Sequence, residues 1–282
     1  MSGIKLTWDI GAFNPEKHYI YRSASPISPS NLPTPIAEVG QGISEYNDLS
    51  ITDGETYHYF VAAEKKGLLC PADSSVSVVA INPPGPQTLI GGDMTAGFFG
   101  ETTTDELITG DALATEIGLT FGTSQFSTEP WLKFGFNGDI IYISKKSYIN
   151  GISWRDIEHV DAIYDDQNSR VIPINGLQYR VTLLTGAEAD PTVEQISNGS
   201  EWNELLYKIH ANDPTNSNWA SYTDSELNLS GYGMATWTQE TRASYTSNAI
   251  RRGSGGLESF GWNDKNANHP NFGWRPVLRL QL

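Results

Sequence analysis

Residues 54–63 read Gly-Glu-Thr-Tyr-His-Tyr-Phe-Val-Ala-Ala and decide the fold of the first part of the chain. Every second side chain of this stretch falls on one face, which is the period of a half-buried β-strand. Segments 4–8, 18–23 and 76–80 show further short strand patterns, with turn residues between them. Several short strands separated by turns predict an all-β sandwich.

The strand pattern stops at Asn82-Pro-Pro-Gly-Pro-Gln87. Three prolines and a glycine cannot form a central strand, because proline has no N–H to donate, so this segment is expected to be a stiff linker. The sequence therefore predicts a first domain over residues 1–82, a linker over 83–89 and a second domain over 90–282.

The second domain has the pattern of an α+β fold. Asn137-Gly138 and Asn175-Gly176 each lie between two strand-like runs, which predicts two tight hairpins. Short helices are expected over 111–117, after Ser153 and after Ser200, because serine is a favoured N-cap and apolar residues follow at helical spacing.

Two segments of this domain, 211–232 and 253–271, are long and polar, with strands expected over 234–240 and 274–280. Ser254-Gly-Gly256 is expected to be a flexible loop rather than a phosphate-binding one. Long loops on a rigid scaffold commonly carry binding residues. The expected ligand-binding residues are the aromatic and polar side chains of these loops, namely Trp219, Tyr222, Tyr232, Trp262, Asn263 and Asp264.

The other tryptophans of the second domain are expected in its core, because large aromatic side chains dominate small cores. They are Trp131, Trp154, Trp202, Trp237 and Trp274. Arg275, which precedes Pro276, is expected to be buried and paired with Glu240, since a buried arginine is almost always paired.

The composition limits the function classes. The chain has 282 residues and a net charge of −15, which disfavours general binding to nucleic acid, whose phosphates are neutralised by basic side chains. Cys70 is the one cysteine, which excludes an intramolecular disulfide and a cysteine-clustered zinc site. No apolar run approaches the roughly 18 residues of a transmembrane helix, and no signal-peptide pattern is present, so we expect synthesis in a cytoplasm without membrane insertion.

The first domain resembles a fibronectin type III domain. The residues that carry the resemblance are Leu6-Thr-Trp8, Tyr19-Ile-Tyr-Arg-Ser23, Tyr46-Asn-Asp48, the stretch 54–63 and Gly67. The resemblance implies that Tyr57 is a tyrosine-corner residue, whose hydroxyl bonds back to the backbone. The family has a strand before the one that bears Trp8, and here the chain starts too late to supply a full one, so an open sheet edge is expected.

The second domain is similar to a C-terminal module of fibre, appendage and decoration proteins of tailed bacteriophages. The matching runs are Gly92–Glu101, Glu129–Phe134, Ile152–Trp154, Tyr179–Leu184, Ser200–Asn203, Trp237–Thr241 and Gly273–Leu278. These modules look related to the C-type-lectin-like and sulfatase-modifying-factor folds. The resemblance implies a place on the virion and attachment to a surface.

Catalytic patterns are weak. None of the five histidines lies in a Gly-x-Ser-x-Gly or His-x-x-x-His setting. Asp165-Asp166, Glu201 and Glu204 qualify for a glycosidase pair by residue type alone. Trp262-Asn-Asp264 matches the calcium-binding triplet of C-type lectins, but no Glu-Pro-Asn precedes it, so an ordinary Asx turn is expected. We therefore expect a non-enzymatic protein with no catalytic residue, cofactor or metal.

These observations together predict a virion attachment or appendage protein, assembled in the host bacterial cytoplasm. Its expected partners are other virion proteins, further copies of itself and a host-surface glycan or protein. Two alternatives remain open, namely a purely structural head-decoration or collar protein without a ligand, and a cell-wall-degrading glycosidase.

Overall fold

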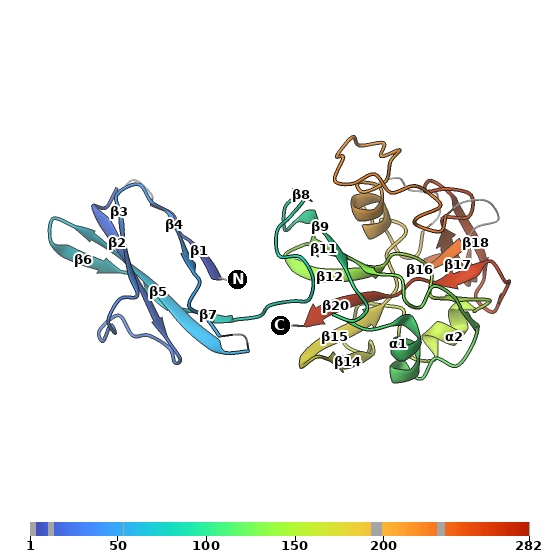
Figure 1. Ribbon diagram of the computed structural model, residues 1–282, viewed down its shortest axis with the longest axis horizontal. Helices are drawn as coiled ribbons and strands as arrows, with labels where there is room; N and C mark the ends of the chain where they lie inside the picture. The colour runs from blue at the N-terminus through green and yellow to red at the C-terminus, as the bar shows by residue number, and fades with distance from the viewer. Residues whose placement is uncertain (1–3, 11–13, 53, 193–198, 230–234, 282) are drawn as a thin grey trace. The chain divides into compact units, whose positions relative to one another are not determined.

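The computed structural model describes residues 4–10, 14–52, 54–192, 199–229 and 235–281. The chain divides into two compact units, Met1–Asn82 and Pro83–Leu282, whose strands and short helices are drawn in Figure 1. Strands predominate in both units and pair mostly in antiparallel fashion, which confirms the predicted β-rich architecture. None of the helices in these ranges is long and apolar enough to cross a lipid bilayer.

The first unit has two antiparallel sheets. Its strands are β1 (Ile4–Thr7), β2 (Lys17–Ser23), β3 (Ala37–Gly40), β4 (Glu45–Asp48), β5 (Thr56–Lys65), β6 (Leu68–Pro71) and β7 (Val76–Val79). The smaller sheet pairs β1 with β4, and the larger one has the order β3-β2-β5-β6, with β7 also pairing with β5.

A buried carboxylate joins these two sheets. Asp48 of β4 is 1 % exposed and accepts hydrogen bonds from Arg22 of β2 and from the Tyr59 hydroxyl of β5, each at 2.7 Å. The Tyr57 hydroxyl accepts a hydrogen bond from the backbone N–H of Thr52 at 3.0 Å, which is the kind of contact that the tyrosine-corner resemblance implies.

The second unit has one seven-stranded and one six-stranded sheet. The seven-stranded sheet has the order β14-β15-β20-β12-β11-β9-β8, and the six-stranded sheet has the order β10-β13-β19-β16-β17-β18 (Figure 1). The strands are β8 (Gly91–Gly92), β9 (Ala96–Thr102), β10 (Thr123–Ser124), β11 (Trp131–Phe136), β12 (Asp139–Ser144), β13 (Ile149–Asn150), β14 (Val171–Ile174), β15 (Leu177–Thr182), β16 (Ala235–Arg242), β17 (Tyr245–Arg252), β18 (Phe260–Asp264), β19 (Phe272–Trp274) and β20 (Val277–Gln281).

Both predicted hairpins are confirmed. Asn137-Gly138 joins β11 to β12 with φ values of 51° and 94°, and Asn175-Gly176 joins β14 to β15 with φ values of 51° and 84°. Positive φ at both positions is what a two-residue type I′ turn requires, and asparagine and glycine adopt it at the lowest cost.

Two of the three expected helices form as predicted. Helix α1 (Gly110–Ile117) ends at the left-handed Gly118, and α2 (Trp154–Glu158) begins with a capping box between Ser153 and Asp156. The third, η2 (Trp202–Leu206), is a π-helical turn rather than an α-helix. The Tyr207 N–H bonds to the Trp202 carbonyl, five residues back, at 3.2 Å.

The predicted core tryptophans are confirmed, since all five have no exposed surface. The partner predicted for Arg275 is wrong. Its guanidinium is fully buried and donates to the carbonyl oxygens of Ser144, Lys145 and Leu227. The carboxylate of Glu240 instead accepts from the Gly186 N–H, 3.0 Å from each oxygen. Backbone carbonyls satisfy Arg275 in place of a carboxylate.

Two parts of the chain differ from their expected roles. The segment 253–271, expected to be a loop, contains the strand β18, which pairs with β17 at the edge of the six-stranded sheet. The segment 83–89, expected to be a linker, falls within the second unit. There its Pro84 carbonyl accepts a hydrogen bond from the Tyr142 hydroxyl at 2.8 Å.

Candidate functional site

A surface cavity of ≈ 500 Å³ lies between the two segments that the sequence marks for recognition. One wall comes from segment 211–232 and the residue just before it, and the other comes from the turn that leads into β18. The lining residues are His210, Asn212, Asp224, Gly255, Gly256, Leu257, Glu258 and Ser259. Loops separated by about thirty residues in the sequence thus form one concave site, as is usual for small-ligand sites.

His210 is the buried centre of the first wall, with 3 % of its surface exposed. Its Nδ1 accepts the backbone N–H of Asn212 at 3.0 Å, and its Nε2 lies 3.2 Å from Oδ1 of Asp224. Because Nδ1 is an acceptor, the neutral ring carries its proton on Nε2 and donates it to Asp224. The histidine therefore orients the Asp224 carboxylate at the edge of the cavity.

The same geometry bears on catalysis. A general base needs a free acceptor within hydrogen-bonding reach of a substrate proton. Both nitrogens of His210 are already engaged, Nδ1 by Asn212 and Nε2 by Asp224. His210 can orient a carboxylate, but the histidine itself cannot accept a proton from Ser259 or from a ligand without breaking one of these bonds.

The second wall is a turn that two hydrogen bonds join to the scaffold. The Leu257 carbonyl accepts from the Trp202 indole N–H at 2.9 Å, and the Ser259 carbonyl accepts from Arg252 Nε at 3.2 Å. Gly255 and Gly256 have φ values of 105° and 123°, which side-chain-bearing residues rarely adopt. These contacts fix Leu257 and Ser259, which follow Ser254-Gly-Gly256 in the chain, to the scaffold.

The first wall is tied down by backbone hydrogen bonds. Tyr222 and Ala211 are joined by an N–H···O bond of 2.8 Å, and the Tyr222 N–H bonds to Ile209 at 3.0 Å. The Leu229 N–H closes the turn behind Asp224 by bonding to its carbonyl at 2.6 Å. Both walls are therefore held in place without a ligand.

The described lining residues are mostly polar, and none of them is a lysine or an arginine. Asn212, Asp224, Glu258 and Ser259 offer amide, carboxylate and hydroxyl groups, and Leu257 is the one large apolar residue among the lining positions. Such a surface can accept hydrogen bonds from hydroxyl or ammonium groups, but it repels anions. Among the described residues, no group of three or more His, Cys, Asp or Glu side chains could hold a metal ion.

The aromatic residues predicted for the first loop lie beside this cavity rather than in its lining. Trp219 is half-buried and packs against the core next to Gly91, where an added Cβ would meet its ring at 2.2 Å. Tyr222 is also half-buried and donates its hydroxyl to Glu101 at 2.7 Å. These two rings fasten the loop to the scaffold.

The residues predicted around the Trp-Asn-Asp triplet lie on β18. Trp262 stacks with Arg242, whose guanidinium carbon is 4.3 Å from the ring centroid. Asn263 accepts a hydrogen bond from Arg251, and Asp264 forms an Asx turn with the Asn266 N–H at 2.8 Å. The hydrogen bonds from Asn266, first of all that of its backbone, lower the pKa of Asp264.

Tyr232, also predicted, lies outside the described residues. Among the other five, the structure forms two separate groups, with Trp219 and Tyr222 in one and the β18 residues in the other. Within the described ranges, no ring contact or hydrogen bond joins the two groups.

The carboxylates considered for a glycosidase pair are engaged elsewhere. Asp165 and Glu201 both contact Arg279, at 3.4 Å and 2.6 Å, so a guanidinium lies where a substrate bond would have to sit. Glu204 pairs with Lys208 at 2.7 Å. Asp166 caps a turn by accepting the Asn168 N–H at 2.7 Å.

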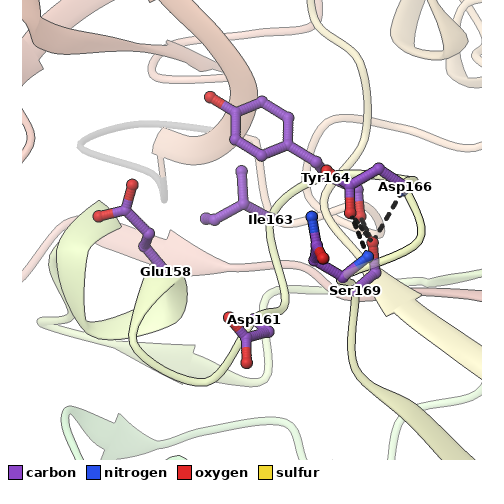
Figure 2. A pocket seen from close by; sticks show the side chains of 7 residues that line it. Glu158, Asp161, Ile163, Tyr164, Asp166 and Ser169 are labelled. Carbon is purple, nitrogen blue, oxygen red and sulfur yellow. Dashed lines mark hydrogen bonds between the residues drawn. The ribbon is translucent and has the colours of Figure 1, made fainter.

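A second, smaller cavity of ≈ 130 Å³ follows α2. Figure 2 shows Asp166 bonded to Ser169 on one side of it, with Glu158 and Asp161 drawn apart from that pair. Burial raises the pKa of Tyr164 to about 12, so this phenol stays protonated at neutral pH. This cavity is smaller than the one at His210.

Sequence reasoning found the two loops but not the residues that form the site. The glycines at 255 and 256 were one available signal, because paired glycines in a loop often mark a required backbone conformation. His210 had no local signature, since its partner Asp224 is fourteen residues away. Comparison with protein-family models, with curated proteins and with solved structures finds no match to this chain.

Proposed function

We propose that this chain is an adhesive structural protein of a bacteriophage particle, and that the cavity between residues 210–224 and 255–259 binds a neutral or amino sugar of the host surface. The observation that carries the proposal is a cavity whose described lining residues are mostly polar and rich in hydrogen-bond acceptors. The proposal includes a fibronectin-type-III-like first domain and a lectin-like second domain.

The chemistry of the lining supports a hydroxyl-rich ligand. Asp224 is fixed by His210, and carboxylates and amides are strong acceptors for sugar hydroxyls. The same carboxylates favour an ammonium group and disfavour a phosphate or sulfate. The expected ligand is therefore a hexose, or an amino sugar with a free amine.

The cavity also suggests how tightly it binds. Among the described residues, no Phe, Tyr or Trp side chain lines it, so these residues supply no stacking of the kind that strengthens sugar binding. A single polar site of this kind is expected to bind with a dissociation constant of about a millimolar. Several copies on one particle would convert weak sites into firm attachment by avidity.

The test has two parts. Antibodies raised against the chain should label purified phage particles in electron micrographs, and the full chain displayed on beads should retain neutral or amino glycans from an array. Asp224→Asn removes one carboxylate charge while keeping an acceptor for His210, so it should reduce retention. Particles without label, or retention equal for wild type and variant, would overturn the proposal.

A second candidate, a docking role without a ligand, has one observation in its favour. Leu68 and Val76 of the first unit are 71 % and 64 % exposed, which is unusual for apolar residues on paired strands. A decoration or collar protein would use such a surface against another virion protein. It would label particles but retain no glycan.

A further inference from the structure

The β16–β17 turn and the edge strand β18 carry a row of aromatic rings around one arginine. Phe260 and Trp262 contact edge to face, with centroids 5.3 Å apart. The guanidinium carbon of Arg242 lies 4.3 Å from the Trp262 ring centroid and 4.9 Å from that of Tyr245. The guanidinium is thus held by two rings, and Tyr245 is 60 % exposed.

This arginine differs from four of the other eight in the chain. Four arginines pair with carboxylates, namely Arg22, Arg155, Arg180 and Arg279. Within the described residues, Arg242 makes no ion pair and no side-chain hydrogen bond. Aromatic stacking covers the flat faces of a guanidinium and leaves its N–H donors in the plane available.

Among the described residues, the nearby carboxylates do not pair with those donors. Oδ1 of Asp190 accepts the N–H and hydroxyl of Thr241 at 2.7 and 2.9 Å. Oδ1 of Asp264 accepts from Asn266. Glu240, on the same strand as Arg242, is 2 % exposed and bonded to Gly186. In a chain of net charge −15, an arginine that pairs with no carboxylate of the described residues can offer its N–H donors to an external anion.

We propose that Arg242, Tyr245 and Trp262 form a binding site for a carboxylate-bearing sugar, a uronic acid residue of an acidic polysaccharide. The fork of N–H donors on a guanidinium matches a planar carboxylate in a bidentate arrangement. The exposed ring of Tyr245 offers the apolar face on which a sugar ring stacks. The site shares no lining residue with the cavity at His210. It extends the proposed function, and its test is independent of the test for neutral-sugar binding.

The site should distinguish a glucuronide from a neutral sugar and from a simple carboxylate. A neutral hexoside presents hydroxyls but no carboxylate, and acetate presents the carboxylate without a ring. Only a glucuronide supplies both groups. Because the interaction is between opposite charges at the surface, it should weaken as salt is raised from about 20 to about 500 mM.

The test uses the full chain and nuclear magnetic resonance, with methyl β-D-glucuronide, methyl β-D-glucoside and acetate as probes. The glucuronide should shift the Arg242 Nε–H signal and show saturation transfer, and the glucoside should not. Arg242→Gln should weaken binding by about tenfold or more, and Arg242→Lys, which keeps the charge but loses the fork, should weaken it nearly as much. Tyr245→Ala should weaken binding several-fold.

Arg155→Gln serves as the matched control, because it removes an arginine that already pairs with Glu158. It should leave glucuronide binding unchanged. Melting temperatures of all variants show whether each is folded, and the exposed position of Tyr245 makes its variant the safest. No glucuronide binding, equal binding of glucoside, equal binding of acetate, or undiminished binding by a folded Arg242→Gln variant would each overturn the site. Loss of neutral-sugar binding by Asp224→Asn would leave it untouched.

Discussion

The ammonium nitrogen of Lys133 lies 2.8 Å from the carbonyl oxygen of Pro86. It also donates to the Pro83 carbonyl at 3.1 Å, and the side chain of Lys133 has no exposed surface. A lysine inside β11 thus holds the proline-rich segment that follows the first unit against the second. Burial lowers the pKa of Lys133 to about 8, because the charged form loses its hydration.

Replacing Lys133 by methionine should release this segment. The variant keeps the apolar stem but leaves two carbonyl oxygens without a donor, at a cost of about 1–3 kcal/mol. Limited proteolysis of the wild type should leave residues 83–87 attached to the second unit. The variant should be cut within them, with Gln87 as a reachable position. Equal protection in both proteins would show that the lysine does not hold the segment.

The same lysine predicts an alkaline effect on stability. Its pKa is about 8 in the folded state and about 10.5 when unfolded, so between these values the unfolded chain holds a proton that the folded protein has released. The free energy of unfolding should therefore rise with pH across this window, by at most about 3 kcal/mol relative to Lys133→Met. Urea denaturation at pH 8 and 10 measures the difference.

Glu240 predicts the opposite trend at lower pH. Burial raises its pKa to about 7 from 4.5, although Gly186 and Thr238 donate to it. The folded protein then holds a proton that the unfolded chain loses, so stability is fully present below about pH 4.5 and falls as pH rises through 7. Glu240→Gln cannot ionise, and its advantage over wild type should grow by up to about 3 kcal/mol between pH 5 and 8.

Chemical denaturation of both proteins at each pH measures that advantage. Glu116→Gln, at an exposed position of α1, is the matched control and should show no pH-dependent difference from wild type. A constant difference between Glu240→Gln and wild type would mean that Glu240 stays ionised in the fold, held by its hydrogen bonds.

The first unit is expected to self-associate through its bare apolar face. Val76 pairs with Tyr59, and Leu68 pairs with Lys65, so strand alternation puts both on the face that carries the Tyr59–Asp48 bond. The sheet opposite has two strands, and β1 pairs with β4 alone among the described strands. A strand from a second copy could add to β1 and cover this face.

Sedimentation should then show dimers or larger species at tens of micromolar, and the double variant Leu68→Glu, Val76→Glu should be monomeric. Ile43→Glu, at another exposed apolar position of the same unit, is the control and should still associate. Cys70→Ser excludes a disulfide artefact. A wild-type chain that stays monomeric at these concentrations contradicts the prediction.

The parts that sequence reasoning predicted well depend on local chemistry. Asn137-Gly138 needs positive φ wherever it lies between two strands, and Ser153 caps α2 with a partner three residues away. The five tryptophans were predictable because a large ring within a regular strand or helix pattern almost always faces a core.

The parts that it missed depend on contacts between distant residues. β18 is an edge strand whose register is set by β17, and its own pattern of glycine and asparagine reads as a loop. Arg275 is satisfied by three carbonyls, and a carbonyl acceptor has no signature in the sequence. The cavity needs Trp202 and Arg252 beneath its turn, and only the folded chain brings them there.

Variants of Trp219 and Asp224 should separate the structural role of the first loop from its role in sugar binding. Trp219→Ala removes a half-buried ring beside Gly91 and the core, which should cost about 2–3 kcal/mol of stability and lower the melting temperature. Below that temperature the variant should still bind neutral sugars, because the ring does not line the cavity. Asp224→Asn should leave the melting temperature nearly unchanged but weaken sugar binding. The variant keeps the acceptor for His210 and removes the charge that faces the ligand. Thermal melts and saturation-transfer spectra with a neutral or amino sugar measure both effects. A folded Trp219→Ala protein that loses sugar binding while Asp224→Asn retains it would place the ligand on the aromatic side chain and not in the cavity.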